Sequence, residues 1–260
     1  LKHFPPQARL GVGSPAGPLL FVDDDGKFSQ TKVVKNEEAS GELFLKLESN
    51  HYIDKYGYLV QELQSRVGWG EAVVASYKVA REYFEQKFGY KLFIFYGTLL
   101  GFRRENNFIA RDNDFDTAYI SKYTDPEAVR AEMVAIMQQL ARDGHKFHVT
   151  SSFFKYGPYG SAFDIFPGWF SGGHLWMPNT TCIAVDQGDV FPLREVEFKG
   201  NPVYIPNAPD VLLEAKYGPG WRSPDPGYTP KLSGTAKPIL AKVKLTDEEI
   251  ASIEKCRSES

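Results

Sequence analysis

An apolar run that stops at a glycine and is followed by paired carboxylates is the feature that most constrains the fold of this chain. Residues 92–96 are almost continuously apolar, as strands covered on both faces are, and the run ends at Gly97. Asp114 and Asp116 follow on the next segment. If residues 114–120 form a strand, these two carboxylates project from the same face of the sheet. The pattern predicts two strands, the second of which carries a pair of acids.

Two carboxylates held this close repel each other unless a positive charge lies between them. A hard divalent cation with oxygen ligands is the simplest explanation, and Mg²⁺ or Mn²⁺ also bridges donor phosphates. Asp112, two residues earlier, is an alternative ligand. The series also resembles an EF-hand, but Thr117 and Tyr123 stand where that loop needs Gly and an acid. A metal site and a solvated acidic loop both remain open.

A third carboxylate, Asp164, lies inside the apolar run 162–167. A charged side chain among strand-forming neighbours costs free energy to bury unless it is paired or bound to a metal ion. Asp164 is therefore predicted to join the other two acids as a metal ligand. The alternative is a partner for a buried Arg or Lys.

Several groups suit an anionic ligand, and three of them closely follow the first apolar run. Gly97 and Thr98, at a predicted strand-to-helix turn, would offer backbone N–H groups and a hydroxyl at a helix N-terminus. Arg104 can supply a bidentate fork, and Lys155 a mobile cation. Each has an ordinary alternative, because any tight turn uses glycine and Arg104 can equally form a surface ion pair.

The remaining pattern predicts alternating helices and strands after an irregular start. Helical spacing of apolar residues indicates helices over 70–90 and 125–142, the second with a capping box at Thr124 to Glu127. Further expected elements are strands over 148–155 and 162–166, a hairpin over 195–204, a helix over 209–217, an irregular stretch over 218–238 and a terminal helix capped at Thr246.

Composition narrows the possible functions. A formal net charge of -3 over 260 residues gives no basic field for a nucleic-acid backbone, so binding to a long duplex is a poor interpretation. Cys182 and Cys256 are far apart, which indicates neither a zinc site nor a disulfide framework. No stretch approaches the roughly 20 apolar residues of a membrane span.

Three blocks of the chain resemble, in order, those of the LicD and fukutin family. They are Tyr96-Gly97-Thr98-Leu99-Leu100-Gly101 with Arg104, Ile109 and Asp112, Asp114 and Asp116; then Phe163-Asp164-Ile165-Phe166-Pro167; then residues 191–193, 198–200, 205–207 and 213–221. This resemblance covers roughly residues 70–222.

The resemblance implies a nucleotidyltransferase fold shared with polymerase β-like enzymes, of α+β class (α/β-like). We expect a small mixed sheet flanked by helices, with C-terminal elaborations. Residues 1–45 would form an irregular N-terminal lead-in, and residues 46–260 the LicD-like catalytic domain.

The resemblance also implies a phosphotransferase of polysaccharide or capsule biosynthesis. Such an enzyme takes phosphocholine, a polyol phosphate or a similar phospho-alcohol from a CDP-linked donor to a hydroxyl of a cell-surface glycan. A phosphodiester forms and CMP is released, with Mg²⁺ or Mn²⁺ as cofactor. The expected setting is the cytoplasm of a bacterium, as a domain of a larger polysaccharide-building protein, or the Golgi lumen of a eukaryote.

In this hypothesis Asp114 and Asp116 are the principal metal ligands, with Asp112 as an alternative. Asp164 binds the ion near the acceptor hydroxyl and helps to remove its proton. Gly97, Thr98, Arg104 and Lys155 would bind the donor phosphates. The rival interpretations are a nucleotidyltransferase that leaves NMP on its acceptor, a glycosyltransferase that uses a sugar nucleotide, and an inactive glycan-binding module.

Overall fold

The computed structural model describes residues 68–109, 114–158, 160–225, 228 and 232–259, with the backbone of five short strands near the N-terminus. The chain divides into two compact units, Leu1–Ser65 and Arg66–Ser260. The first unit contains a three-stranded antiparallel sheet and a two-stranded antiparallel pair. Their strands are β1 (Gly11–Val12), β2 (Leu20–Val22), β3 (Phe28–Gln30), β4 (His51–Ile53) and β5 (Leu59–Gln61). The domain boundary between residues 45 and 46 stays a prediction.

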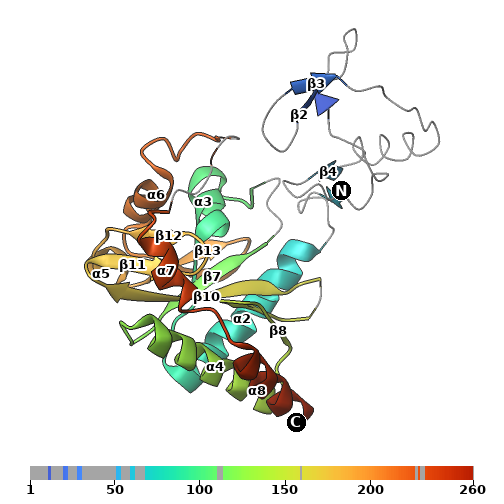
Figure 1. Ribbon diagram of the computed structural model, residues 1–260, viewed down its shortest axis with the longest axis vertical. Coiled ribbons are helices and arrows are strands. Elements are labelled where there is room, and N and C mark those ends of the chain that lie inside the picture. The colour runs from blue at the N-terminus through green and yellow to red at the C-terminus, as the bar shows by residue number, and fades with distance from the viewer. Residues whose placement is uncertain are drawn as a thin grey trace, which may run out of the picture. The chain divides into compact units, whose positions relative to one another are not determined.

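A nine-stranded mixed sheet lies at the centre of the second unit (Figure 1). Its strands are β6 (Phe93–Ile94), β7 (Asp116–Ile120), β8 (Phe147–Val149), β9 (Phe154–Tyr156), β10 (Phe163–Ser171), β11 (His174–Met177), β12 (Thr181–Ile183), β13 (Arg194–Phe198) and β14 (Asn201–Ile205). Strand β10 runs parallel to β7 along one edge. Along its other edge it pairs with β9 through its first residues and with β11 through its last. Strand β10 is therefore central to the sheet.

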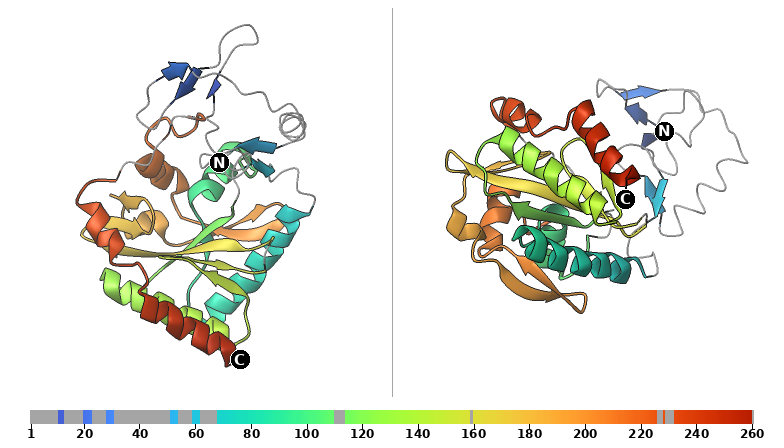
Figure 2. Two further views of the ribbon diagram at one scale, coloured as in Figure 1. Left: turned by 45° about the vertical axis from the view of Figure 1, so that its right-hand side comes forward. Right: turned by 90° about the horizontal axis from the view of Figure 1, so that it is seen from below.

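Helices cover both faces of this sheet. Their bounds are α2 (Trp69–Phe88), α3 (Tyr96–Glu105), α4 (Pro126–Arg142), α5 (Gln187–Val190), α6 (Pro209–Tyr217), α7 (Ala236–Ala241) and α8 (Asp247–Ser258). Figures 1 and 2 show α2, α4 and α8 on one face, and α3 and α6 on the other. The expected mixed sheet flanked by helices is confirmed, but with nine strands it is larger than the small sheet that was expected.

The core between α2 and the sheet is rich in aromatic side chains. Tyr77 on α2 is fully buried and packs against Phe115 and Phe163. Its hydroxyl donates to the carbonyl of Leu92 at 2.8 Å and accepts from the amide of Tyr204 at 3.1 Å. These bonds join α2 to β14 and to the residue before β6.

Most predicted elements are found within a residue or two of their expected ends. The helices predicted over 70–90, 125–142 and 209–217 and the hairpin over 195–204 are confirmed. The terminal helix has the predicted capping box, in which Thr246 accepts from the amide of Glu249.

Three predictions are corrected. Helix α4 is capped by Asp125 rather than Thr124, since the Asp125 side chain accepts from the Ala128 amide at 3.0 Å. The expected strand over 92–96 shortens to Phe93–Ile94, because Tyr96 is already helical. Helix α7 begins inside the stretch 218–238 that was predicted to be irregular.

A fourth correction concerns the strand expected over 148–155, which is two strands joined by a turn. The Thr150 hydroxyl donates to the carbonyl of Phe153 at 2.6 Å and accepts from its amide at 3.3 Å. Such local bonds let threonine close a turn in place of a strand ladder. Strands β8 and β9 therefore form a hairpin.

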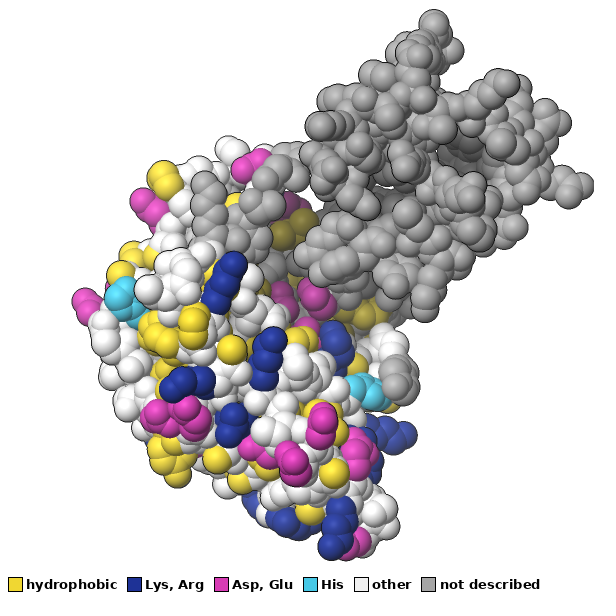
Figure 3. Space-filling model, viewed as in Figure 1, with side chains coloured by type: hydrophobic (Ala, Val, Ile, Leu, Met, Phe, Trp, Pro, Cys, Tyr) yellow, Lys and Arg dark blue, Asp and Glu magenta, His cyan; other side chains and the backbone are white. Residues whose placement is uncertain are grey.

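Two further properties bear on possible partners. Basic and acidic side chains are interspersed over the face that Figure 3 shows. Among the described residues, no helix combines the length and the apolar character that crossing a lipid bilayer requires.

Candidate active site

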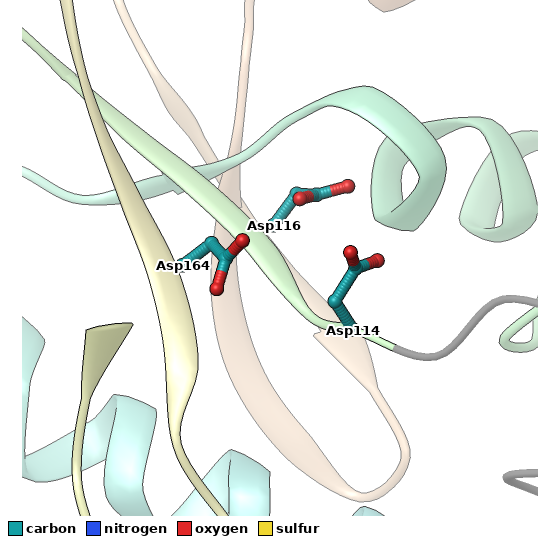
Figure 4. Close-up of side chains that lie close together, drawn as sticks. All are labelled: Asp114, Asp116 and Asp164. Atoms are coloured by element: carbon teal, nitrogen blue, oxygen red, sulfur yellow. The ribbon is translucent and has the colours of Figure 1, made fainter. Parts of the chain in front are cut away.

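Three carboxylates from two neighbouring strands converge on one face of the sheet. Asp116 opens β7, Asp114 lies two residues before it, and Asp164 on β10 is the direct neighbour of Asp116 in the parallel register. One oxygen from each lies within 4.8 Å of the others, and Figure 4 shows the three side chains grouped together. Asp116 and Asp164 are buried, and Asp114 is half-buried. The structure thus brings together three of the predicted metal ligands.

The alternation of side chains along β7 and β10 produces this arrangement. Phe115 and Phe163, which alternate with the acids, turn to the opposite face and pack against each other. The two strands are joined locally by the Asp164 amide, which donates to the Phe115 carbonyl at 2.9 Å. The Thr117 hydroxyl donates to the Asp164 carbonyl at 2.8 Å. The acids are therefore placed by buried, hydrogen-bonded backbone.

The first turn of α3 holds Asp116. The Gly97 amide donates to Oδ2 of Asp116 at 3.1 Å, and the Thr98 hydroxyl accepts from the Asp116 amide at 2.7 Å. A carboxylate at a helix N-terminus is favourable, because the free amides there carry partial positive charge. Gly97 and Thr98 thus lie at the site as expected, with both predicted groups engaged by Asp116. Their binding to phosphate stays a prediction.

Lys155 pairs with Asp164. Its Nζ lies 2.5 Å from Oδ1, because the two residues are opposite each other in the antiparallel register of β9 and β10. Burial raises the pKa of the Asp164 carboxyl to about 6; the Lys155 ammonium acts in the opposite direction, and the charge of Asp114 adds to the increase. Asp164 is therefore both the partner of a lysine, as the alternative interpretation predicted, and a member of the acidic cluster.

Arg104 lies further along α3. Helical spacing places Gly97, Gly101 and Arg104 on one face of the helix. The chain returns closely against this face, since a Cβ on Gly101 would lie 2.5 Å from the Asn107 carbonyl oxygen. The Arg104 side chain is only 10% exposed, with Nη2 3.7 Å from Glu105. A phosphate contact by Arg104 stays a prediction. Asp112 lies outside the described residues.

Lys216 on α6 is a basic residue beside this site that sequence reasoning did not single out. Its Nζ donates to the carbonyl oxygen of Thr180 at 2.6 Å and to its hydroxyl at 2.7 Å. It also lies 5.2 Å from the ring centroid of Tyr96, the residue before Gly97. A lysine in the last turn of a helix is common and does not by itself indicate a functional site. The only sequence signal for Lys216 was its position in the third block of the family resemblance, residues 213–221.

The chemistry of the three acids suits a hard divalent cation. Such an ion takes oxygen ligands from carboxylates, and three carboxylate oxygens within 4.8 Å can meet at a single ion. The burial of Asp116 and Asp164 strengthens the case, since charged groups away from water need a cation as partner. These residues therefore fit Mg²⁺ or Mn²⁺.

The comparison with known families agrees with this arrangement. No curated protein matches the chain. Residues 89–208 match the family model described as LicD/FKTN/FKRP, nucleotidyltransferase domain. The matched segment runs from before β6 to beyond β14 and contains all three carboxylates. This match supports the assignment of the segment 89–208 to the LicD/FKTN/FKRP family.

Proposed function

We propose that this protein transfers a phospho-alcohol, such as phosphocholine or a polyol phosphate, from a CDP-linked donor to a hydroxyl of a cell-surface glycan. The observation that carries the proposal is the convergence of Asp114, Asp116 and Asp164 within 4.8 Å, beside the first turn of α3. Family membership supports it, because the family is of the transferase type and in general metal-dependent. We also propose the polymerase β-like nucleotidyltransferase fold for residues 46–260.

Asp114, Asp116 and Asp164 would hold Mg²⁺ or Mn²⁺. When bound, the ion supplies positive charge that stabilises the donor diphosphate and the negative charge developing on the leaving CMP. Buried backbone keeps Asp116 and Asp164 in place, which favours catalysis by positioning. Asp114 is the most accessible of the three and borders the solvent side of the cluster.

The reaction would be an in-line displacement at the distal phosphorus of the donor. The acceptor oxygen forms a bond to phosphorus while the bond from phosphorus to CMP breaks. Asp164 would accept the hydroxyl proton, since Lys155 bonds to its Oδ1 and no hydrogen bond to its other oxygen is found among the described residues. Gly97, Thr98, Arg104 and Lys155 would orient the donor phosphates around this centre.

The test is nucleotide release. The protein is incubated with Mg²⁺, a panel of CDP-alcohols and candidate glycans, and CMP is followed by mass spectrometry. We expect CMP from one donor, and its loss by a factor of about 100 or more in Asp114→Asn. The control is Glu197→Gln, which removes an exposed acid on β13. NMP attached to the acceptor, or a nucleoside diphosphate released from a sugar nucleotide, would contradict the proposal and favour the rival enzymes.

Metal binding is tested apart from turnover. Isothermal titration with Mn²⁺ should show a site in the wild type and in Glu197→Gln. Affinity should fall at least tenfold in Asp114→Asn and in Asp164→Asn, since each removes one charged ligand. Equal affinity in all four proteins would exclude the acidic cluster as the metal site.

A further inference from the structure

A half-buried lysine lies beside the acidic site without a carboxylate partner among the described ion pairs. Lys216 is in the last turn of α6, beyond the segment 89–208 that matches the family. Its ammonium donates to two oxygens of Thr180 and lies over the ring of Tyr96. The partners observed in the structure are thus a carbonyl, a hydroxyl and an aromatic face. All three are neutral.

Neutral partners compensate only partly for the loss of water around an ammonium. Burial lowers the pKa of Lys216 to about 8, and no other cause contributes to this shift. By comparison, the buried carboxylate of Asp164 has a direct ionic partner in Lys155. A buried charge without an ionic partner is costly, and such groups gather where a charged ligand binds.

Tyr96 connects this lysine to the acidic cluster. Its hydroxyl donates to the Pro178 carbonyl at 2.5 Å and accepts from the Thr181 hydroxyl at 2.9 Å, which fixes the ring. Its backbone has φ 44°, a conformation uncommon outside glycine, and the next amide, of Gly97, donates to Asp116. One residue therefore contacts Lys216 through its ring and sets the amide that holds a predicted metal ligand.

The opposite charges of this region come from different elements. The three acids lie on β10 and at the start of β7, whereas the Lys216 ammonium comes from α6, lies over the Tyr96 ring and bonds to Thr180, between β11 and β12. A nucleotide diphosphate has two phosphates in a row. If the acids and their cation take the phosphate that is transferred, a separate cation next to Tyr96 suits the phosphate that remains on the nucleoside.

We propose that Lys216 binds the phosphate that stays on the nucleotide, so that it recognises the nucleoside monophosphate half of the donor and the released product. This inference rests on the proposed function and deepens it. Lys216 is a binding residue in this proposal, and Thr180 and Tyr96 position its ammonium.

Equilibrium binding of CMP and of cytidine, each with Mg²⁺, tests the proposal without turnover. The two ligands differ only in the phosphate. We expect Lys216→Met to weaken CMP binding about 10- to 100-fold and to leave cytidine binding within about twofold, because a charged hydrogen bond is lost only for CMP. Lys216→Arg should keep most of the affinity. Lys237→Met, at an exposed lysine of α7, is the matched control.

A purely structural role for Lys216 gives a different result. If the lysine only fastens the turn, Lys216→Met and Thr180→Val would both lower the melting temperature and leave the ratio of CMP to cytidine affinity as in the wild type. If the folded Lys216→Met protein has the same ratio of CMP to cytidine affinity as the wild type, the inference is refuted.

The choice of nucleotide separates the two proposals. UMP, AMP and GMP are measured in parallel with CMP. Binding of another monophosphate in place of CMP, still dependent on Lys216, would refute the CDP donor and keep the phosphate contact. If CMP binds equally well to the wild type and to Lys216→Met, the phosphate contact is refuted and the CDP donor is kept. No monophosphate binding to the wild type would refute both.

Discussion

Replacing Asp164 with asparagine is expected to stabilise the metal-free protein while it removes metal binding. The Asp164 side chain is only 5% exposed, and burial raises its pKa from 3.8 to about 6 despite the ammonium of Lys155. In the folded state the carboxyl therefore holds its proton more tightly than in the unfolded chain. Ionisation of this group above pH 6 works against folding.

The size of the effect follows from the shift. A change from 3.8 to about 6 is about 2 pKa units. At roughly 1.36 kcal/mol per unit, ionised Asp164 costs about 3 kcal/mol of folding free energy at neutral pH. The cost is absent below about pH 4, where the group is protonated in both states, and grows as the pH rises to about 6. Asparagine has the shape of the protonated acid and carries no charge, so Asp164→Asn should regain about this amount.

Urea denaturation in EDTA between pH 4 and pH 7 measures this prediction. Asp164→Asn should match the wild type near pH 4 and exceed it by about 2–3 kcal/mol at pH 7, with an unchanged denaturant slope. Added Mn²⁺ should stabilise only the wild type, by mass action on the folded state. The reasoning is refuted if Asp164→Asn is less stable than the wild type at pH 7 in EDTA. It is also refuted if the difference in free energy of unfolding between the two proteins does not change with pH.

Three further predictions address the surroundings of the site, each by urea denaturation. Gly101→Ala should lose about 1–3 kcal/mol, because its Cβ would lie 2.5 Å from a backbone oxygen, whereas Gly234→Ala, in open space, should be neutral. Thr98→Val should lose about 1–3 kcal/mol by leaving the buried Asp116 amide without its acceptor, and serine at the same position should restore it. Wild type should gain stability over Lys216→Met as the pH rises from about 8 toward 10.5, since the folded pKa of Lys216 lies at about 8. A difference that stays flat across that range would contradict the last of these.

The sequence was sufficient for the parts of the site that depend on local periodicity. Asp114 and Asp116 were predicted on one face because side chains alternate along a strand, and the structure places them so. Asp164 could be added because a charged residue inside an apolar run needs a partner. Its position directly beside Asp116 depends on the register of β7 and β10, a nonlocal pairing that no local pattern specifies.

The hydrogen-bond and ion-pair partners of the other predicted site residues also depend on contacts between segments that are distant in the sequence. Gly97 and Thr98 were expected to face phosphate, yet in the structure they bond to Asp116. Lys155 was expected to be a mobile cation, yet it lies opposite Asp164 across β9 and β10. All three residues lie beside the acidic cluster. What the sequence could not show is that a buried carboxylate takes the nearest donor.

These pairings suggest how the site remains folded with three acids within 4.8 Å of one another. Repulsion between them is opposed by the amide of Gly97 on one side and by the ammonium of Lys155 on the other. Both groups are also among those proposed to contact the donor. A lysine that already neutralises a metal ligand can approach a phosphate only if the ion takes over that neutralisation. Cation and donor should therefore bind with positive cooperativity, each strengthening the other by the same factor. Lys155→Met should reduce that coupling, because the two events would no longer share a residue.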